Sequence, residues 1–152
     1  MSVKVVFIGN PFGGDDGIGP FLYNELRDHP ELKSFELMEL GVIGIDLLSY
    51  VDDDDQLIIV DAVKSDDQYG QVIVLGEKDL SKNLSVVSQH DFGVEQTATI
   101  LRAFKPKIKK IQFIGIKVKN LNEFSDKLSD EVMEKMSQIK EDVVNNIKKI
   151  VG

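Results

Sequence analysis

The chain has 152 residues, of which 42% are hydrophobic and 29% charged, and its formal net charge is -8 at pH 7. This size and composition predict one globular domain, and the negative charge disfavours nucleic acids and anionic membrane surfaces as partners. The absence of cysteine excludes disulfides, thiolate metal sites and cysteine nucleophiles. There is no signal-peptide pattern and no apolar run long enough to span a membrane, so we expect a cytoplasmic protein.

Apolar runs and helical periodicity predict alternating strands and helices along the chain. The expected strands are 3–8, 35–40, 56–60, 71–75 and 111–118, and the expected helices are about 16–29, 44–51, 92–104 and from 129 onward. The last helix has the clearest pattern, because its apolar residues recur at helical spacing. These residues are Val132, Met136, Ile139, Val143 and Ile147.

The order of the elements predicts the sheet. Strand–helix–strand units connect through right-handed crossovers, which places the first strand between the second and the third in a parallel sheet. The link 63–70 is too short for a crossover helix, so we expect the fourth strand to return antiparallel beside the third. The expected fold class is therefore a three-layer α/β/α sandwich with a mostly parallel sheet of about five strands, in a single domain over 1–152.

Candidate functional residues gather where the first and third strands end. The segment Gly9–Gly19, GNPFGGDDGIG, contains Asp15 and Asp16, and Asp61 directly follows the third strand. Open α/β sheets bind ligands beyond the carboxyl ends of their strands, where the strand order reverses. His90 precedes the third helix, and we expect it to join the acids at this edge. Two carboxylates and an imidazole suit a divalent transition metal.

Each candidate also has a structural interpretation that the sequence leaves open. Asp15 or Asp16 alone could cap a helix. Asp61 alone could belong to a turn, and His90 alone could be a loop histidine with satisfied hydrogen bonds. We expect the glycines of 9–19 to permit tight turns and a close approach of the backbone to a ligand.

Three other polar features are interpreted as surface. His29 lies at a helix end next to a proline and is expected to be exposed. The run Asp52–Asp55 lies opposite the predicted site and lacks the ligand spacing of a calcium loop, so we interpret it as a solvated turn. The basic residues between Arg102 and Lys110 are interpreted as solvated, with docking of an acidic partner segment as the alternative.

Known motifs narrow the chemistry of the glycine-rich segment. It contains no dinucleotide fingerprint and no phosphate-loop lysine, and the chain has no serine-hydrolase elbow. Four segments in order instead resemble the hydrogenase maturation endopeptidase family. They are Gly9–Pro20, Glu39–Leu48, Ile59–Ala62 and Ser88–His90.

This resemblance implies a protease that removes the C-terminal extension from the large-subunit precursor of a [NiFe] hydrogenase after nickel is installed. The family's metal-contacting and catalytic positions correspond to Asp16, Asp61 and His90 in this sequence. The family often has Glu at the first position, so Asp16 is a shorter variant. The resemblance also implies that Glu39–Gly41 lines the cleft, and that nickel belongs to the substrate, with no permanently bound cofactor.

The mechanism and two alternative functions stay open at this stage. The metal could polarise the scissile carbonyl, activate water or position the peptide. Because the chain lacks cysteine and a serine-triad motif, direct attack by water is the more economical mechanism. The alternatives are a non-catalytic nickel-binding maturation chaperone and a receiver-like phosphoacceptor domain, in which Lys117 would be the late-strand lysine. Residues 10–14 argue against a receiver, because they separate the acid pair from its strand.

Overall fold

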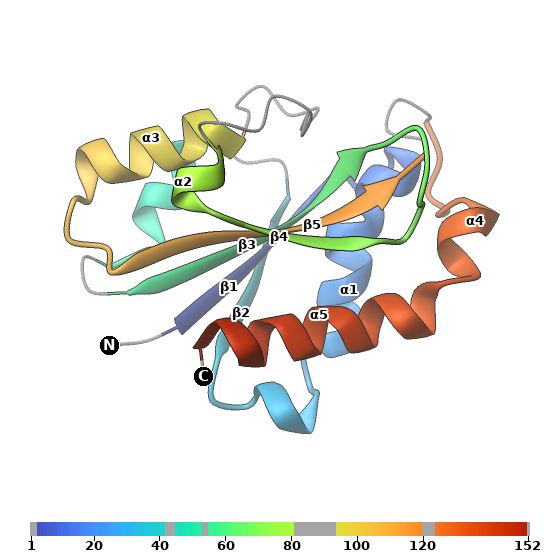
Figure 1. Cartoon of the computed structure of the whole chain (residues 1–152), viewed down its shortest axis with the longest axis horizontal. Helices are drawn as coiled ribbons and strands as arrows, with labels where there is room; N and C mark the ends of the chain where they lie inside the picture. Colours follow the sequence, from blue (N-terminus) through green and yellow to red (C-terminus); the bar gives the residue numbers. More distant parts are fainter. Residues whose placement is uncertain (1–2, 42–44, 53–54, 81–93, 120–123, 152) are drawn as a thin grey trace.

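The computed structural model describes residues 3–41, 45–52, 55–80, 94–119 and 124–151 (Figure 1). These residues form the strands β1 (Val3–Ile8), β2 (Glu36–Gly41), β3 (Gln56–Lys64), β4 (Val72–Gly76) and β5 (Lys110–Val118). The α-helices are α1 (Ile18–Leu26), α2 (Glu77–Leu80), α3 (Val94–Phe104), α4 (Asp130–Met133) and α5 (Met136–Val151). Short 3-10 turns are η1 (Gly14–Gly17), η2 (Pro30–Leu32) and η3 (Ile45–Ser49).

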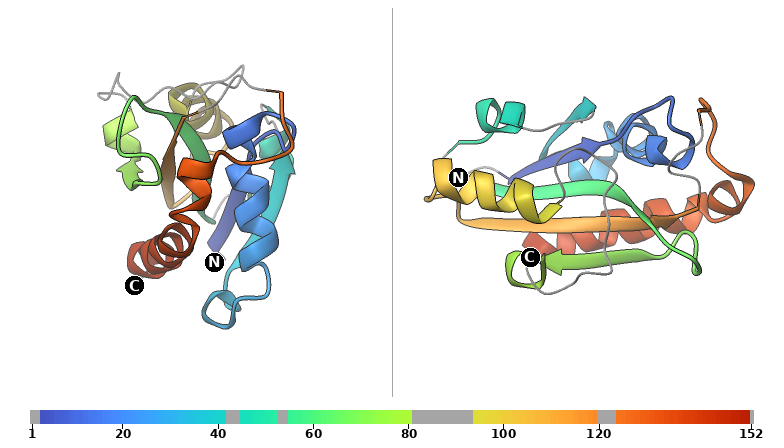
Figure 2. Two further views of the ribbon diagram at one scale, coloured as in Figure 1. Left: turned by 90° about the vertical axis from the view of Figure 1, so that its right-hand side faces the viewer. Right: turned by 90° about the horizontal axis from the view of Figure 1, so that it is seen from above.

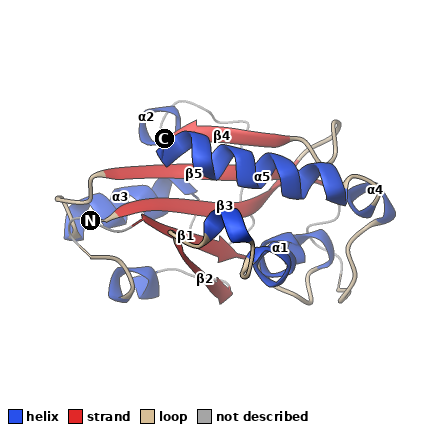
Figure 3. Ribbon diagram, turned by 90° about the horizontal axis from the view of Figure 1, so that it is seen from below, coloured by secondary structure: helices blue, strands red, loops and turns tan. Residues whose placement is uncertain are grey.

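The strands form one sheet in the order β2-β1-β3-β5-β4 (Figure 3). Among the described strands, only β4 and β5 pair in the antiparallel direction. Helices α1 and α5 cover one face, and α3 covers the other (Figure 2). The α/β class, the three layers, the mostly parallel sheet and the position of β1 between β2 and β3 are therefore confirmed.

The neighbour of β4 corrects one prediction. A hairpin of β3 with β4 is wrong, because β5 lies between them and pairs with β3 along its whole length. The link 65–71 passes beside the end of β5, where Ser65 N donates to Val118 O over 3.1 Å and Gly70 N donates to Lys117 O over 2.7 Å. Neighbouring strands lie about 4.8 Å apart, so a short link easily crosses one intervening strand. The length of the link excludes a crossover helix, but it does not determine which strand lies beside β4.

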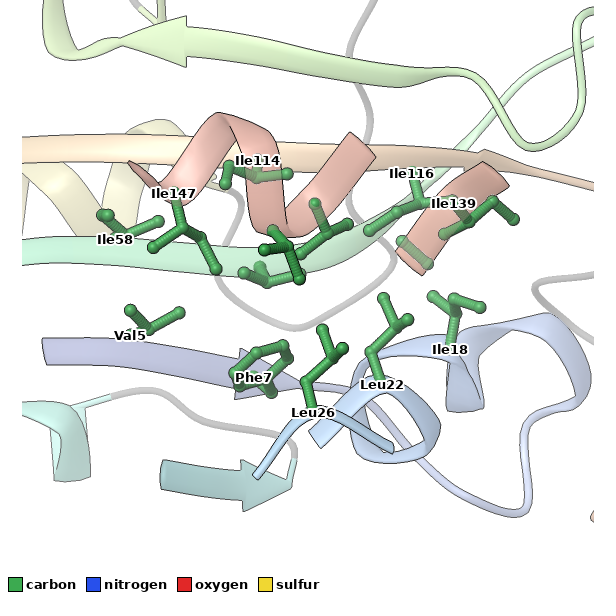
Figure 4. Packing of buried hydrophobic residues seen from close by; sticks show 14 of the residues in the cluster. Val5, Phe7, Ile18, Leu22, Leu26, Ile58, Ile114, Ile116, Ile139 and Ile147 are labelled. Carbon is green, nitrogen blue, oxygen red and sulfur yellow. The ribbon is translucent and has the colours of Figure 1, made fainter. Parts of the chain in front are cut away.

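A hydrophobic cluster lies on each face of the sheet. The first packs α1, α4 and α5 against the sheet (Figure 4). Its members include Val5, Phe7, Ile18, Leu22, Leu26, Ile58, Ile114, Ile139 and Ile147. The second packs η3 and α3 against the other face, with Leu47, Ala98, Leu101, Leu57, Ile59 and Phe113 among its members. Successive residues of β1, β3 and β5 belong alternately to the first and the second cluster, which explains why these strands are apolar on both faces.

The expected C-terminal helix is present but interrupted. Ser129 caps α4, and its Oγ accepts from Val132 N over 3.4 Å. The helix is broken between α4, which ends at Met133, and α5, which begins at Met136. All the residues predicted to face inward are buried: Val132, Met136, Ile139, Val143 and Ile147.

Candidate active site

The loop after β1 folds back on itself and on β2. Gly9 N donates to Gly41 O over 3.1 Å, and Gly13 N donates to Asn10 O over 2.9 Å. Gly14 then adopts a φ of 61°, a left-handed conformation that favours glycine. The end of β2, which contains the Glu39–Gly41 segment, therefore lies beside this loop.

Two glycines of this segment allow close packing of the chain on itself. A Cβ on Gly9 would lie 2.1 Å from Asp16 O, and a Cβ on Gly19 would lie 2.0 Å from Ile8 O. The expectation that these glycines make room for a ligand is corrected at both positions, because the protein's own backbone occupies the space. They let η1 and the first turn of α1 lie directly on the end of β1.

Asp16 lies in η1, at the carboxyl end of β1. Its side chain is largely buried, with the residue 7% exposed, and Oδ2 accepts from Asn10 N over 3.1 Å. This hydrogen bond closes the loop between Asn10 and Asp16. The η1 turn packs against β3, the strand that contains Asp61.

Asp61 lies where β1 and β3 separate. The pairing of β1 with β3 ends at Phe7 and Val60, whereas β3 continues beside β5 to Lys64. Asp61 is thus the first residue beyond the β1 pairing, although the prediction that it directly follows the strand is wrong, because it lies within β3. It is 2% exposed, and its Oδ1 accepts from Ala62 N over 2.8 Å. Its partner in β5 is Gly115.

Asp15 has a different set of partners from its neighbour. Its Oδ1 accepts from Ser129 N over 2.6 Å, and its Oδ2 accepts from Ser129 Oγ over 2.8 Å and from Lys119 N over 3.1 Å. The side chain is fully buried. Asp15 therefore joins η1 to the chain around the end of β5 and the start of α4. Figure 1 shows the end of β5 and α4 near each other at the right. Sequence reasoning missed this role, because nothing local in the sequence marks Ser129 as its partner.

The third predicted site residue, His90, lies outside the described residues, so its place beside Asp16 and Asp61 stays a prediction. Within the described part of the chain, no group of three or more His, Cys, Asp or Glu side chains could hold a metal ion. Two carboxylates provide hard oxygen ligands but fall short of the three protein ligands typical of a catalytic transition-metal site. A metal here therefore needs a further donor, from His90 or from a bound partner.

The aspartate run after η3 contains a buried ion pair. Lys4 Nζ lies 2.8 Å from Asp55 Oδ2 and 3.3 Å from Asp52 Oδ2, and Asp55 is 1% exposed. Burial by itself would lower the pKa of Lys4, but its hydrogen bonds to Asp55 and Asp52 outweigh that effect and raise the pKa. The interpretation of the run as a solvated turn is therefore wrong for Asp55.

Arg102 is likewise a structural residue. Its Nε and Nη2 each lie 2.9 Å from a carboxylate oxygen of Glu77, and this bidentate pair joins α3 to α2. The hydrogen bond to Glu77 raises the pKa of Arg102 above its ordinary value, against the opposing effect of burial. The solvated interpretation is wrong for this residue. His29, expected at the surface, is half-buried, and its Nδ1 accepts from Glu31 N over 3.1 Å.

Comparison with known proteins identifies the class to which this fold and site belong. The sequence model of the hydrogenase maturation protease family, HycI, matches residues 21–146. The chain therefore belongs to the hydrogenase maturation protease family. It is a peptidase, and the resemblance drawn from the sequence motifs is confirmed.

Individual relatives agree with this assignment. The hydrogenase 2 maturation protease of Escherichia coli strain K12 is 26% identical over 119 residues, which cover 76% of this chain and 73% of that protein. The structure of the [NiFe] hydrogenase maturation protease HybD from Thermococcus kodakarensis superposes with a TM-score of 0.78 at 25% identity, covering 100% of both chains. The hydrogenase maturating endopeptidase HybD of E. coli shares the fold, with a TM-score of 0.76 at 23% identity over 98% of this chain and 93% of that one.

The described residues contain no helix that is long and apolar enough to cross a membrane.

Proposed function

We propose that this peptidase removes the C-terminal extension from the large-subunit precursor of a [NiFe] hydrogenase after nickel insertion. Membership of the hydrogenase maturation protease family supports the reaction class. The observation that carries the proposal further is the packing of η1, which contains Asp16, against β3, where Asp61 is the first residue beyond the β1 pairing. Both carboxylates thus belong to the edge at which an open α/β sheet binds its ligand.

Nickel enters this reaction as part of the substrate. We assign its recognition to Asp16, Asp61 and His90, which together offer two oxygen ligands and one nitrogen ligand. This set is incomplete for a transition metal, so the remaining positions belong to the precursor and to water. The protease then needs no permanently bound cofactor, and it gains affinity only for a precursor whose metal centre is complete.

Water is the nucleophile in the proposed reaction. Its oxygen adds to the scissile carbonyl carbon while a carboxylate of the site accepts a proton, and that proton passes to the amine as the C–N bond breaks. The absence of cysteine from the chain excludes a thiolate nucleophile. We further propose that the protein acts in the cytoplasm, with the precursor as its partner.

The alternative functions lose their support at this point. The family assignment identifies a peptidase, whereas a receiver domain and a nickel-binding chaperone would carry out no peptide hydrolysis. Lys117, the candidate receiver lysine, donates from Nζ to Gln68 Oε1 over 3.0 Å at the surface. No observation favours a phosphoacceptor role for it.

The first test compares two forms of the precursor. Nickel-loaded and nickel-free large subunit are digested side by side by the purified protein, and the products are identified by mass. We expect cleavage of the loaded form only, because the metal supplies the binding energy that selects it. Equal rates for the two forms would contradict nickel-dependent recognition, and no cleavage of either would contradict the precursor assignment.

The second arm of the test assigns the residues. Asp16→Asn, Asp61→Asn and His90→Ala should each lower cleavage of the loaded precursor by at least about 100-fold, as expected for loss of a ligand or general base. His29→Ala is the matched control, because it removes the other histidine of the chain. Equal activity of His90→Ala and His29→Ala would show that His90 is wrongly assigned.

A further inference from the structure

Two phenylalanines lie exposed near the candidate site. Phe12, in the loop after β1, is 56% exposed, and Phe124, in the segment after β5, is 90% exposed. Their rings stack with centroids 6.5 Å apart and an interplanar angle of 17°. Neither residue belongs to the two hydrophobic clusters of the fold. The pair therefore leaves much of its aromatic surface in water, although burial of such rings is strongly favourable.

The backbone holds the pair in a defined position. Gly14 N donates to Ser125 O over 2.8 Å, and Ser125 N donates to Phe12 O over 2.9 Å. These bonds form a small bridge between the loop after β1 and the segment after β5. The buried carboxylate of Asp15, bound to Lys119 N and to Ser129, reinforces the same junction. Fixed aromatic side chains make good binding contacts, because little conformational freedom is lost when they are covered.

The pair is also joined to the candidate site by hydrogen bonds. Phe12 N donates to Asn10 Oδ1 over 2.9 Å, and Asn10 N donates to Asp16 Oδ2 over 3.1 Å. One residue, Asn10, thus orients both the aromatic pair and the Asp16 carboxylate. The aromatic pair and Asp16 therefore share one short loop, residues 10–16.

We infer that Phe12 and Phe124 bind an apolar side chain of the precursor polypeptide next to the bond that is cut. This inference rests on the proposed function, in which the ligand at Asp16 is a protein chain rather than a small molecule. A polypeptide reaching the site extends beyond it on both sides, and the aromatic pair adjoins the site through Asn10. The pair determines affinity for the polypeptide and takes no part in bond cleavage.

The test compares Phe124→Ser with a matched control. Phe104, the last residue of α3, is 67% exposed and leads through 105–109 into the start of β5, at the opposite end of the sheet from the site. Steady-state cleavage of nickel-loaded precursor is measured by mass, and binding of the same precursor is measured by interferometry. Loss of an aromatic contact should raise KM and Kd roughly tenfold for Phe124→Ser, with kcat nearly unchanged. Phe104→Ser should match the wild type.

Further variants and outcomes keep the inference separate from the proposed function. Phe124→Leu should recover most of the affinity, and Phe12→Ser should repeat the effect of Phe124→Ser. If the wild type cleaves the precursor and Phe124→Ser has the same KM, the inference is overturned and the function stands. If the wild type does not cleave, the function fails, and equal Kd values for the wild type and Phe124→Ser overturn the inference as well. A wild-type dimer that Phe124→Ser converts to a monomer would assign the pair to self-association and overturn the inference.

Discussion

The adjacent carboxylates of Asp15 and Asp16 are held by different parts of the chain. Asp15 accepts hydrogen bonds from Lys119 and Ser129, whereas Asp16 accepts one from Asn10 in its own loop. The two residues therefore have different roles: Asp15 fixes the position of η1, and Asp16 is oriented within the loop that forms the candidate site.

Another buried carboxylate, that of Asp55, lies against Lys4 at the amino end of the sheet. In Lys4→Met the aspartate keeps its buried position but loses the lysine. We expect the free energy of unfolding at pH 7 to fall by about 3 kcal/mol, as when one partner of a buried pair is removed. The measurement is urea unfolding of the wild type and the variant.

The difference in the free energy of unfolding between the wild type and Lys4→Met should depend on pH, because the pKa of Lys4 is raised. A raised lysine pKa stabilises the fold fully below the ordinary value of 10.5, and the contribution is lost as the pH rises through the folded-state value. The gap between wild type and Lys4→Met should therefore stay constant from pH 7 to 9 and narrow above about pH 10.5. Lys64→Met removes an exposed strand lysine and should change stability by less than about 0.5 kcal/mol. If the stability difference between the wild type and Lys4→Met widened at alkaline pH, the stabilising role of the Lys4–Asp55 ion pair would be contradicted.

The position of α1 depends on a glycine. Its first turn lies on the end of β1 because Gly19 has no side chain. This contact also sets the position of η1, and with it that of Asp16. The glycine-rich segment therefore allows α1 to pack against the end of β1. This packing in turn determines where the candidate site lies.

Gly19→Ala should destabilise the protein by about 3 kcal/mol or more, because its Cβ would overlap the Ile8 carbonyl and α1 would have to move. Cleavage should also fall, since the movement displaces η1. The measurements are thermal unfolding and the cleavage rate. Gly76→Ala is the control, because its Cβ would meet only Asp79 Oδ2, at an ordinary 3.6 Å. Equal stability of the two variants would contradict the role of Gly19.

Over the whole molecule, the sheet joins two hydrophobic clusters into one unit. Successive residues of β3 alternate between them, with Ile58 and Val60 in the first and Leu57 and Ile59 in the second. Loss of packing on either face therefore weakens the same strands. We expect the two layers to unfold together.

Ile139→Ala and Leu101→Ala, one in each cluster, should each lower the free energy of unfolding by about 2–5 kcal/mol. In both variants, unfolding monitored by far-UV circular dichroism and by NMR should give coincident midpoints. Val74→Ala, at a 38% exposed position of the edge strand β4, should cost much less. Separate midpoints for the two probes would show that the layers unfold independently.

Local patterns predicted much of the fold and part of the site. The apolar runs located the strands of the sheet, and helical spacing located the buried residues of α4 and α5. Both predictions succeeded because residues that are buried on one or two faces of an element recur at regular intervals in the sequence. The motifs around Asp16 and Asp61 pointed to the protease family, and both residues lie at the expected edge of the sheet. The place of His90 beside them stays a prediction.

The sequence by itself determined the α/β class, the position of β1 between β2 and β3, and the family, because these depend on short-range periodicity, on the handedness of crossovers and on contiguous motifs. Only the tertiary structure decided that β5 separates β3 from β4, that Asp15 binds Ser129, and that Phe12 stacks on Phe124. Each of these contacts joins residues far apart in the chain. Such contacts depend on how packed layers bring segments together, and a local pattern in either segment does not specify its partner.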